Sequence, residues 1–387
     1  MKIVTQVKLT PSPEVAAVLE STLHTVNEHA NRVSALAFER RVFRNYDLRK
    51  IAYADVREAG IGSQAAQHLI KKVADGYATL RANLRAGNYG KPGSKRRVTV
   101  ESKPITFRPE AAQPYDQRNM SFDLDAQTVS LWTVSGRIKN IPFACSAEAL
   151  KNLAGKRGEA DLLRREGVWF LVVTLDVPEA AQYEPDGFIG VDLGIENIAT
   201  TSTGYLAAGR KLNRYRKRQL DLRRKLQAKG TKSAKRLLKK RSRKESRRTR
   251  DINHCISKTI VTEAKRTGRG IALEDLTGIR ARVRHRKPQR VTLHSWAFAQ
   301  LGQFLVYKAQ RDGVPLVHVD AAYTSQMCCE CGHTDRKNRV DQGRFICRGC
   351  GVVAHADRNA SHNIARRGVT VWNEGRQSPV PATTTPR

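Results

Sequence analysis

No apolar segment of 18 residues occurs in the chain, so no helix is predicted to span a membrane. The first residues, MKIVTQVKLTPSPE, contain no apolar core of the kind found in secretory signals, and no lipidation motif is present. These absences argue against both an integral membrane protein and a secreted one. We therefore expect a soluble protein of the cytoplasm.

Acidic residues are scarce beside basic ones. Asp and Glu number 36 and Lys and Arg number 70, which gives a formal net charge of +34. A chain this positive repels itself unless a polyanion neutralises much of the charge. Nucleic acid is the expected partner, because phosphate contacts favour Lys and Arg. An anionic membrane surface is the alternative, and the absence of membrane-inserting features argues against it.

Cysteine is used sparingly, and its distribution argues against disulfides. Five of the seven cysteines fall within residues 328–350, whereas a disulfide scaffold spreads its cysteines through a small secreted chain. Two Cys-x2-Cys pairs separated by fifteen residues have the spacing of a four-cysteine zinc ribbon. Four thiolates complete a tetrahedral shell, so such a zinc would be structural; four buried free thiols are the alternative. The predicted ligands are Cys328, Cys331, Cys347 and Cys350, with Cys329 pointing away.

The first 185 residues combine strand patterns with helical ones. A strand is predicted at 3–9, followed by a helix that Ser12 caps and by a further helix over 63–80. Short β-branched or aromatic segments between turns predict the remaining strands, at 98–100, 105–107, 120–124, 129–134, 138–141 and 168–177. We interpret this order as an antiparallel β-barrel. Its first strand (1–10) is separated from its remainder (96–185) by a helical insertion (11–95).

A strongly basic run occupies residues 210–250, where 21 of 41 residues are Lys or Arg and two are acidic, which leaves +19. Apolar residues at three- and four-residue spacing predict an amphipathic helix over at least its first half. A solvated charged face is the alternative to a helix that lies along a phosphate backbone. The predicted nucleic-acid contacts are Arg214, Arg218, Arg223, Arg224 and Lys225. The loop 278–290 adds further positive charge.

Three acidic residues stand where strands end or a helix begins. Asp192 follows an apolar strand, Glu274 ends a second one, and Asp357 lies at the start of an expected helix. Carboxylates gathered at such positions can hold Mg²⁺ or Mn²⁺, and two such ions would activate a water and stabilise the leaving oxygen in phosphodiester hydrolysis. A solvated surface acid is the alternative for each of them, as for Asp275 beside Glu274.

Several segments together resemble the carboxy-terminal half of TnpB proteins, the transposon-encoded nucleases that are related to type V CRISPR effectors. The resemblance extends over about residues 188–367 and rests on GVDLGIENIATTSTG, IALEDLTGIR, HSWAFAQLGQFLVYKAQRDGVPLVHVDAAYTSQMCCECG, FICRGCG and HADRNASHNIA. It implies a multidomain α+β protein. The β-barrel with its helical insertion would be followed by a ribonuclease H-like (RuvC) α/β domain (186–326 and 353–370) that carries a zinc ribbon (327–352). A disordered tail is expected at 371–387.

The resemblance also implies roles for individual residues. Asp192, Glu274 and Asp357 match the three catalytic acids, which bind Mg²⁺ or Mn²⁺ in the family. Cys328, Cys331, Cys347 and Cys350 match the ligands of a structural Zn²⁺. Asn359 and Asn363 match the family's last helix and are expected to support the third acid.

The implied activity is RNA-guided cleavage of double-stranded DNA beside a short flanking motif, by one chain with one guide RNA, in the bacterial cytoplasm at the nucleoid. A miniature type V CRISPR effector shares this chemistry. An RNA-guided repressor and a nuclease without a guide are the alternatives from other classes.

Overall fold

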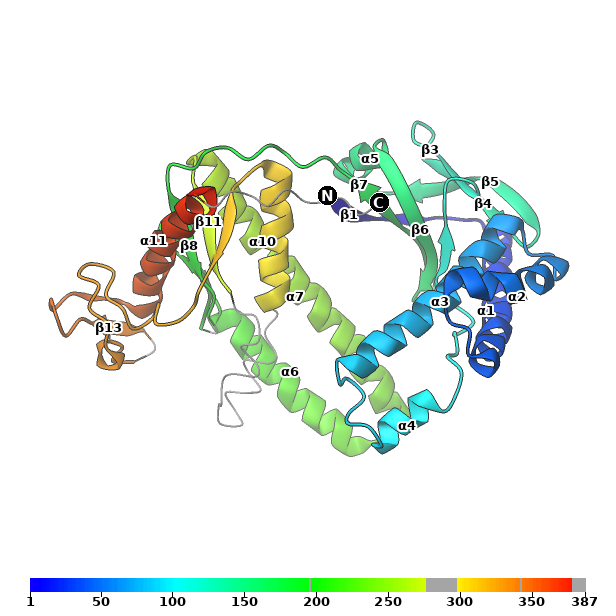
Figure 1. Ribbon diagram of the computed structural model, residues 1–387, viewed down its shortest axis with the longest axis horizontal. Helices are drawn as coiled ribbons and strands as arrows, with labels where there is room; N and C mark the ends of the chain where they lie inside the picture. Colours follow the sequence, from blue (N-terminus) through cyan, green and yellow to red (C-terminus); the bar gives the residue numbers. More distant parts are fainter. Residues whose placement is uncertain (195, 276–297, 342, 378–387) are drawn as a thin grey trace. The chain divides into compact units, whose positions relative to one another are not determined.

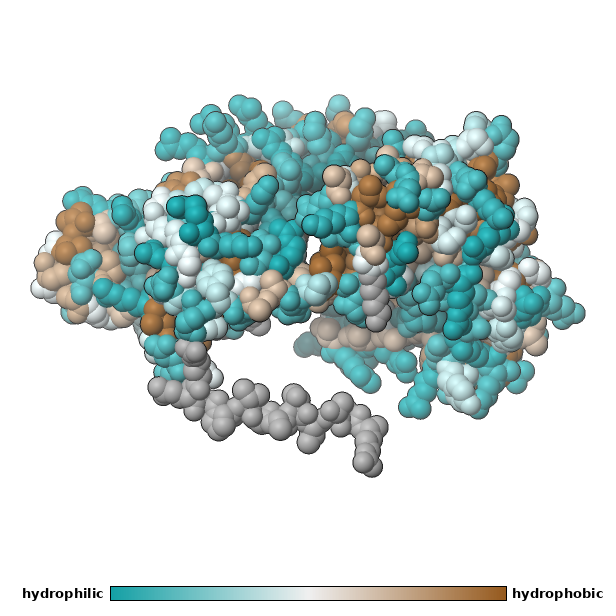
Figure 2. Space-filling view, turned by 90° about the horizontal axis from the view of Figure 1, so that it is seen from above, coloured by the Kyte–Doolittle hydropathy of each residue, from teal (hydrophilic) through white to brown (hydrophobic). Residues whose placement is uncertain are grey.

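The computed structural model describes residues 1–194, 196–275, 298–341 and 343–377 (Figure 1). The chain divides into two units, Met1–Val177 and Pro178–Arg387. The basic loop predicted at 278–290 lies outside the described residues. Hydrophilic residues, drawn in teal, cover most of the face seen in Figure 2, as expected from the excess of Lys and Arg. Among the described residues, no helix combines the length and the apolar character needed to cross a bilayer.

The first unit is built on a seven-stranded antiparallel sheet with the order β2-β6-β7-β1-β5-β4-β3. Its edge strands β2 and β3 are consecutive in the chain, so residues 116–119 connect the two edges of the sheet. A link this short requires the sheet to curl into a nearly closed barrel, as predicted. The strands are β1 (Lys2–Leu9), β2 (Gln113–Tyr115), β3 (Met120–Asp123), β4 (Thr128–Thr133), β5 (Gly136–Ala144), β6 (Lys156–Arg165) and β7 (Val168–Asp176).

Helices follow β1 before the rest of the sheet, at the place in the chain where a helical insertion is predicted. They are α1 (Pro13–Arg40), α2 (Asn45–Glu58), α3 (Ser63–Arg85) and α4 (Lys95–Glu101), and a short α5 (Ala147–Leu153) lies between β5 and β6. Ser12 caps α1 as predicted, since its hydroxyl accepts a hydrogen bond from the Val15 N–H. One face of α1–α3 forms a core of its own, separate from the barrel core.

Two of the predicted strands are wrong. Residues 98–100 belong to α4, and residues 105–107 form no strand. Side chains of α1 form hydrogen bonds with the backbone of this second segment. The Asn31 amide donates to the Phe107 carbonyl and accepts from the Phe107 N–H, and the Ser34 hydroxyl donates to the Ile105 carbonyl over 2.6 Å. The segment therefore packs with the helices, and the sheet resumes only at Gln113.

The second unit has a mixed five-stranded sheet with the order β10-β9-β8-β11-β12. The strands are β8 (Phe188–Asp192), β9 (Asn197–Thr201), β10 (Leu206–Ala208), β11 (Gly270–Glu274) and β12 (Leu316–Val319). β8, β11 and β12 are parallel, whereas β9 returns antiparallel to β8, and β10 is antiparallel to β9. The carboxyl ends of three neighbouring strands therefore meet at one edge.

Helices cover both faces of this sheet, as Figure 1 shows. The helices are α6 (Arg210–Lys229), α7 (Lys232–Arg266), α10 (Phe298–Asp312) and α11 (Ala356–Gln377). Ile189 and Leu273 pack against α7 and α10 on one face, while Phe188 and Ala272 pack against α11 on the other. A small β-hairpin, β13 (Arg344–Ile346) and β14 (Val353–His355), precedes α11.

The predicted disordered tail is wrong for its first residues. Residues 371–377 are the last turns of α11, where the Trp372 ring lies 5.9 Å from the Phe188 ring and its indole N–H donates to Glu184. These contacts stabilise a segment whose composition alone indicated disorder. Residues 378–387 lie outside the described residues. The finer division of the chain into domains stays a prediction.

Candidate active site

The sheet of the second unit places two of the predicted acids side by side. Asp192 is the last residue of β8 and Glu274 the last residue of β11. The parallel register pairs Val191 with Leu273, so the two acids occupy the next position of neighbouring strands. Asp357 is the second residue of α11, the helix that packs against β8 and β11. The fold thus brings together three acids that lie far apart in the sequence.

The environment of these carboxylates is buried and mutually repulsive. Glu274 is 8% exposed and Asp357 7% exposed, whereas the neighbouring Asp275 is exposed. Burial and the negative charges of Glu274 and Asp357 hold the pKa of Asp192 well above its usual range. Burial also raises the pKa of Glu274, against the effect of a hydrogen bond from Thr324. The structure therefore separates Glu274 from Asp275, which the sequence pattern could not do.

Among the described residues, three further side chains contact the acids, and none of them was predicted from the sequence. Thr324 Oγ1 donates to Glu274 Oε1 over 2.6 Å, and Asn197 Nδ2 donates to Asp357 Oδ2 over 2.9 Å. The Arg339 guanidinium lies 3.5 Å from Asp357 Oδ1. Its positive charge also lowers the pKa of Asp192 and Glu274, against the dominant effect of burial. Arg339 thus places a cation among these carboxylates, and the positive charge of Arg367 also lowers the pKa of Glu274.

The expectation for Asn359 and Asn363 needs correction. We expected both to support Asp357, but their amides bond to the backbone of Thr324, Met327 and Cys329. The side-chain amide that contacts Asp357 belongs to Asn197. The reason is geometric, since positions 359 and 363 of α11 face the chain that leads into the cysteine cluster.

The donor set of the three acids fits a hard divalent cation. Carboxylate oxygens are the ligands that Mg²⁺ and Mn²⁺ prefer, and a cation would offset the burial and the repulsion that together raise the pKa of Asp192. Among the described residues, these acids do not form a group whose oxygens all lie within 4.8 Å of one another. A pair of ions about 3.5–4 Å apart needs ligands spread over a wider region.

The four predicted cysteines do form such a tight group. Their sulfur atoms all lie within 4.8 Å of one another, with Cys328 Sγ 3.7 Å from Cys350 Sγ and Cys331 Sγ 3.5 Å from Cys347 Sγ. A tetrahedral zinc with Zn–S bonds of about 2.3 Å separates its sulfurs by about 3.8 Å. The arrangement of the four cysteines is therefore compatible with a tetrahedral metal site.

Each Cys-x2-Cys pair forms the same turn. Gly332 and Gly351 both have φ of 75°, and their N–H groups donate to the carbonyls of Cys328 and Cys347. Such left-handed backbone favours glycine. A hydrogen bond from the backbone N–H of Cys350, together with one from Gly349, lowers the pKa of the Cys347 thiol to about 6, which favours the thiolate that metals bind. Cys329 does not belong to the cluster, as predicted.

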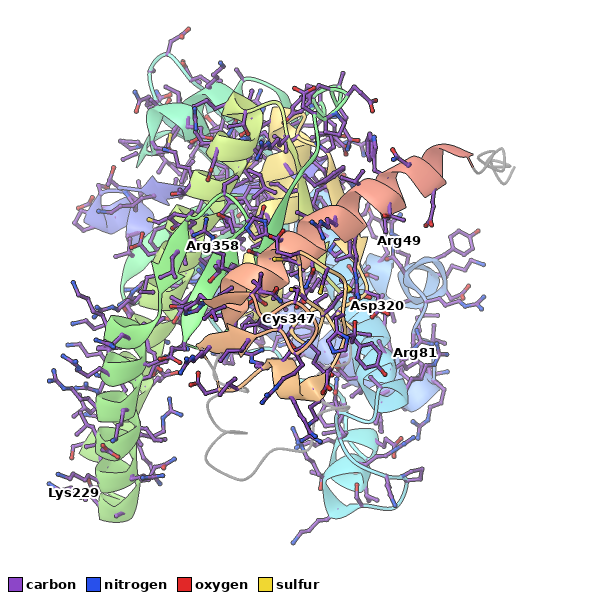
Figure 3. The ribbon with its side chains drawn as sticks, turned by 90° about the vertical axis from the view of Figure 1, so that its left-hand side faces the viewer. Arg49, Arg81, Lys229, Asp320, Cys347 and Arg358 are labelled. Atoms are coloured by element: carbon purple, nitrogen blue, oxygen red, sulfur yellow. The ribbon has the colours of Figure 1, made fainter. Side chains whose placement is uncertain are left out.

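The basic run forms an antiparallel helical hairpin of α6 and the first half of α7. Arg223 pairs with Glu245 at 3.3 Å, and the Arg248 guanidinium stacks 4.3 Å from the centre of the Tyr215 ring. All five predicted contact residues on α6 are exposed, although Arg223 and Arg224 each have an acidic neighbour. Figure 3 shows Lys229 at the end of α6, a helix from which nitrogen-tipped side chains project along its whole length. Their contact with nucleic acid stays a prediction.

The chain is similar to known proteins in sequence and in fold. A family model described as a probable transposase (OrfB_IS605) matches residues 170–277, and a model of the Cas12f1-like TNB domain matches residues 298–364. A cryo-EM structure of a Cas12f1–sgRNA–target DNA complex has a similar fold, with a TM-score of 0.63 and 15% identity over 92% of this chain and 83% of that one.

Two of the relatives that match in sequence illustrate the similarity. The CRISPR-associated endodeoxyribonuclease Cas12f1 of Sulfoacidibacillus thermotolerans is 33% identical over 220 residues, which cover 52% of this chain and half of that protein. The TnpB-like protein MJ0751 of Methanocaldococcus jannaschii is 30% identical over 205 residues, which cover 52% of this chain and 70% of that protein. With the transposase model matching the segment that carries Asp192 and Glu274, the chain belongs to the TnpB family.

Proposed function

We propose that the protein is an RNA-guided DNA endonuclease of the TnpB type, which hydrolyses phosphodiester bonds at a metal-dependent carboxylate site. The observation that carries this proposal is the convergence of Asp192, Glu274 and Asp357 from two parallel strand ends and one helix start. The strand order β10-β9-β8-β11-β12, with β9 antiparallel to its neighbours and helices on both faces, supports a ribonuclease H-like fold of the RuvC type.

The three acids would hold Mg²⁺ or Mn²⁺. When bound, such ions supply an activated water and stabilise the charge on the leaving oxygen. The residues of the chain provide the rest of the site. Thr324 and Asn197 each fix one carboxylate by a hydrogen bond, and Arg339 places beside Asp357 a positive charge that would attract an anionic phosphate.

The four cysteines would hold a structural Zn²⁺, because a complete shell of thiolates leaves no open position for a substrate. The ion would fix residues 327–352 as a zinc ribbon next to α11. Arg339 belongs to this segment, so the ribbon contributes a side chain to the candidate active site.

We infer the partners from charge and from relatives. The α6–α7 hairpin offers exposed Lys and Arg residues that suit a phosphate backbone without reading its sequence. The Cas12f1 structure of similar fold is described in complex with sgRNA and target DNA. For this chain we propose one guide RNA per protein chain and a double-stranded DNA target beside a short flanking motif, in the bacterial cytoplasm at the nucleoid.

The experiment begins with the RNA. The protein is purified from cells that carry its gene with flanking DNA, and the copurified RNA is sequenced. The loaded complex is then incubated with Mg²⁺ and duplexes that match the guide. We expect one defined RNA encoded beside the gene and cleavage only of the matched duplex. An RNA encoded in a repeat array would favour a type V CRISPR effector. Binding of the matched duplex without cleavage would favour an RNA-guided repressor. Cleavage by the protein without RNA would favour a guide-free nuclease.

A matched pair of variants tests the carboxylate site. Glu274→Gln should abolish cleavage and leave RNA binding unchanged, because it removes a metal ligand and not the basic surface. Asp275→Asn changes an exposed acid one position away and should cut at the rate of the unmodified protein. Equal cleavage by the two variants would contradict the assignment. Asp192→Ala should behave as Glu274→Gln does.

A further inference from the structure

One face of α11 binds a long stretch of backbone. Asn359, Asn363 and Arg367 follow one another at four-residue intervals and therefore lie on the same side of the helix. Arg367 Nη1 donates to the Asp320 carbonyl over 2.6 Å. Asn363 Nδ2 donates to the carbonyls of Thr324 and Met327 over 2.9 and 2.7 Å. Figure 3 shows Asp320 beside this helix and Cys347 near its start.

Asn359 continues the same contact into the cysteine cluster. Its Nδ2 donates to the Met327 carbonyl over 2.7 Å, and its Oδ1 accepts from the Cys329 N–H over 2.9 Å. These peptide groups flank Cys328, a predicted zinc ligand. Both asparagines are fully buried, so their hydrogen bonds do not compete with water. The helix that carries Asp357 is thus bonded directly to the first Cys-x2-Cys turn.

Between these contacts lies Thr324, which is 3% exposed. Its carbonyl accepts from Asn363, and its hydroxyl donates to Glu274 Oε1 over 2.6 Å. The preceding residue, Tyr323, has φ of 62°, a left-handed conformation that costs free energy in a residue other than glycine. Such a conformation persists only where its surroundings impose it. The hydrogen bonds from α11 to the neighbouring carbonyls provide that constraint.

We propose that Thr324 is a positioning residue that fixes the Glu274 carboxylate for its cation, and that Asn363 holds Thr324 in place from α11. The proposal rests on the proposed function in taking Glu274 as a metal ligand. One short segment carries both the hydroxyl that contacts Glu274 and the first turn of the cysteine cluster. The folding of the zinc ribbon and the placement of a catalytic acid are therefore linked through this segment.

The test compares Thr324→Val with Thr324→Ser. Valine keeps the shape of the side chain and removes the hydroxyl, whereas serine restores the hydroxyl. The readout is binding of Mn²⁺ to the purified protein, measured by titration calorimetry and counted as the component that Glu274→Gln abolishes. We expect Thr324→Val to weaken this component by about 10- to 100-fold and Thr324→Ser to bring it within a few-fold of the unmodified protein. Zinc content should stay unchanged in both.

Asn363→Ala provides a second route to the same result and remains informative if Thr324→Val does not fold. It should weaken Mn²⁺ binding in the same direction, and combined with Thr324→Val it should cause no further loss, because both changes act through one hydrogen bond. Unchanged Mn²⁺ binding in Thr324→Val or in Asn363→Ala would overturn the proposal. The proposal would also be overturned if Thr324→Ser bound Mn²⁺ as weakly as Thr324→Val, or if the losses of Mn²⁺ affinity were additive in the double variant.

The two proposals fail in different ways. If the RNA-loaded unmodified protein cuts no DNA, the proposed function fails, while Mn²⁺ binding still decides the role of Thr324. If the unmodified protein cuts DNA, and Thr324→Val binds Mn²⁺ and cuts as well as the unmodified protein, only the positioning role fails.

Discussion

Gly190 lies in the middle of β8, two residues before Asp192, and it faces α11. A Cβ atom at this position would overlap the Ser361 carbonyl oxygen and lie 2.5 Å from the Ala365 N. Both are backbone atoms of α11, so no change of rotamer relieves the contact. In Gly190→Ala the helix must therefore move away from the strand. Asp357, which α11 carries, would then move relative to Asp192.

The size of the effect follows from the clash. Overpacking a core costs about 1–3 kcal/mol, and a backbone clash belongs at the upper end, at about 3 kcal/mol. For a unit of this size, each kcal/mol lowers the melting temperature by about 2–4 °C, so a loss of about 6–12 °C is expected. Under the proposed function, the cleavage rate should also fall, by on the order of 100-fold, because a catalytic group misplaced by about 1 Å costs about that factor in rate.

The matched control is Gly375→Ala, a change of the same kind near the end of α11. No heavy atom lies within 4 Å of the added Cβ among the described residues. Alanine favours a helix over glycine by about 1 kcal/mol, so this variant should melt at or slightly above the original temperature and cut normally. Thermal melts of the free protein and single-turnover cleavage by the RNA-loaded complex give the two readouts. Gly190→Ala that melts and cuts as Gly375→Ala does would refute this account of the strand–helix contact.

Three further predictions concern other parts of the chain. Cys347→Ser should lower the zinc content measured by mass spectrometry and destabilise the ribbon locally, whereas Cys329→Ser, a buried cysteine outside the cluster, should retain zinc. Changing the five predicted contact residues of α6 to Gln should reduce the salt dependence of RNA binding by about 3.5 to 4.5 in log–log slope, while changing the four arginines among these five residues to Lys should preserve the slope. Burial lowers the pKa of Lys72, which donates to Asn27, from 10.5 to about 8. Between these values the unfolded chain keeps a proton that the folded chain has lost. The free energy of unfolding should therefore rise with pH in this window, by at most about 3 kcal/mol, and the rise should be absent in Lys72→Met when urea titrations at about pH 7.5 and about pH 10 are compared.

Strands of the barrel could be predicted where their own residue pattern specifies a strand, and not where pairing with distant strands does. β7 reads VWFLVVTLD with alternate residues buried, so its pattern alone predicts a strand. β6 reads KRGEADLLRR and was missed, because its pairing with β2 and β7, and not its composition, makes it a strand. The opposite error occurred at α4, where Val98 and Val100 suggested a strand. That segment has no buried residue and no neighbouring strand among the described residues with which to pair.

In the candidate site, too, some features could be predicted from the sequence and others could not. The positions of Asp192 and Glu274 follow from a local rule, since residues that end neighbouring parallel strands meet at one edge. The orientation of each carboxylate depends instead on single hydrogen bonds across the chain, from Thr324 to Glu274 over 50 residues and from Asn197 to Asp357 over 160. No local pattern distinguishes these donors from other threonines and asparagines.

One signal for the tertiary contacts was nevertheless present in the sequence. Asn359, Asn363 and Arg367 repeat at the spacing of one helical face, and two amides and a guanidinium on the same face predict contacts with backbone rather than burial in an apolar core. The spacing could not say which backbone they contact. That backbone is the segment between β12 and the first cysteine turn. A substitution in the ribbon should therefore change the position of the Glu274 carboxylate although no acid is substituted. Under the proposed function, the effects of substituting the acids can be predicted from the sequence alone, whereas the proposed link between the ribbon and Glu274 follows only from the fold.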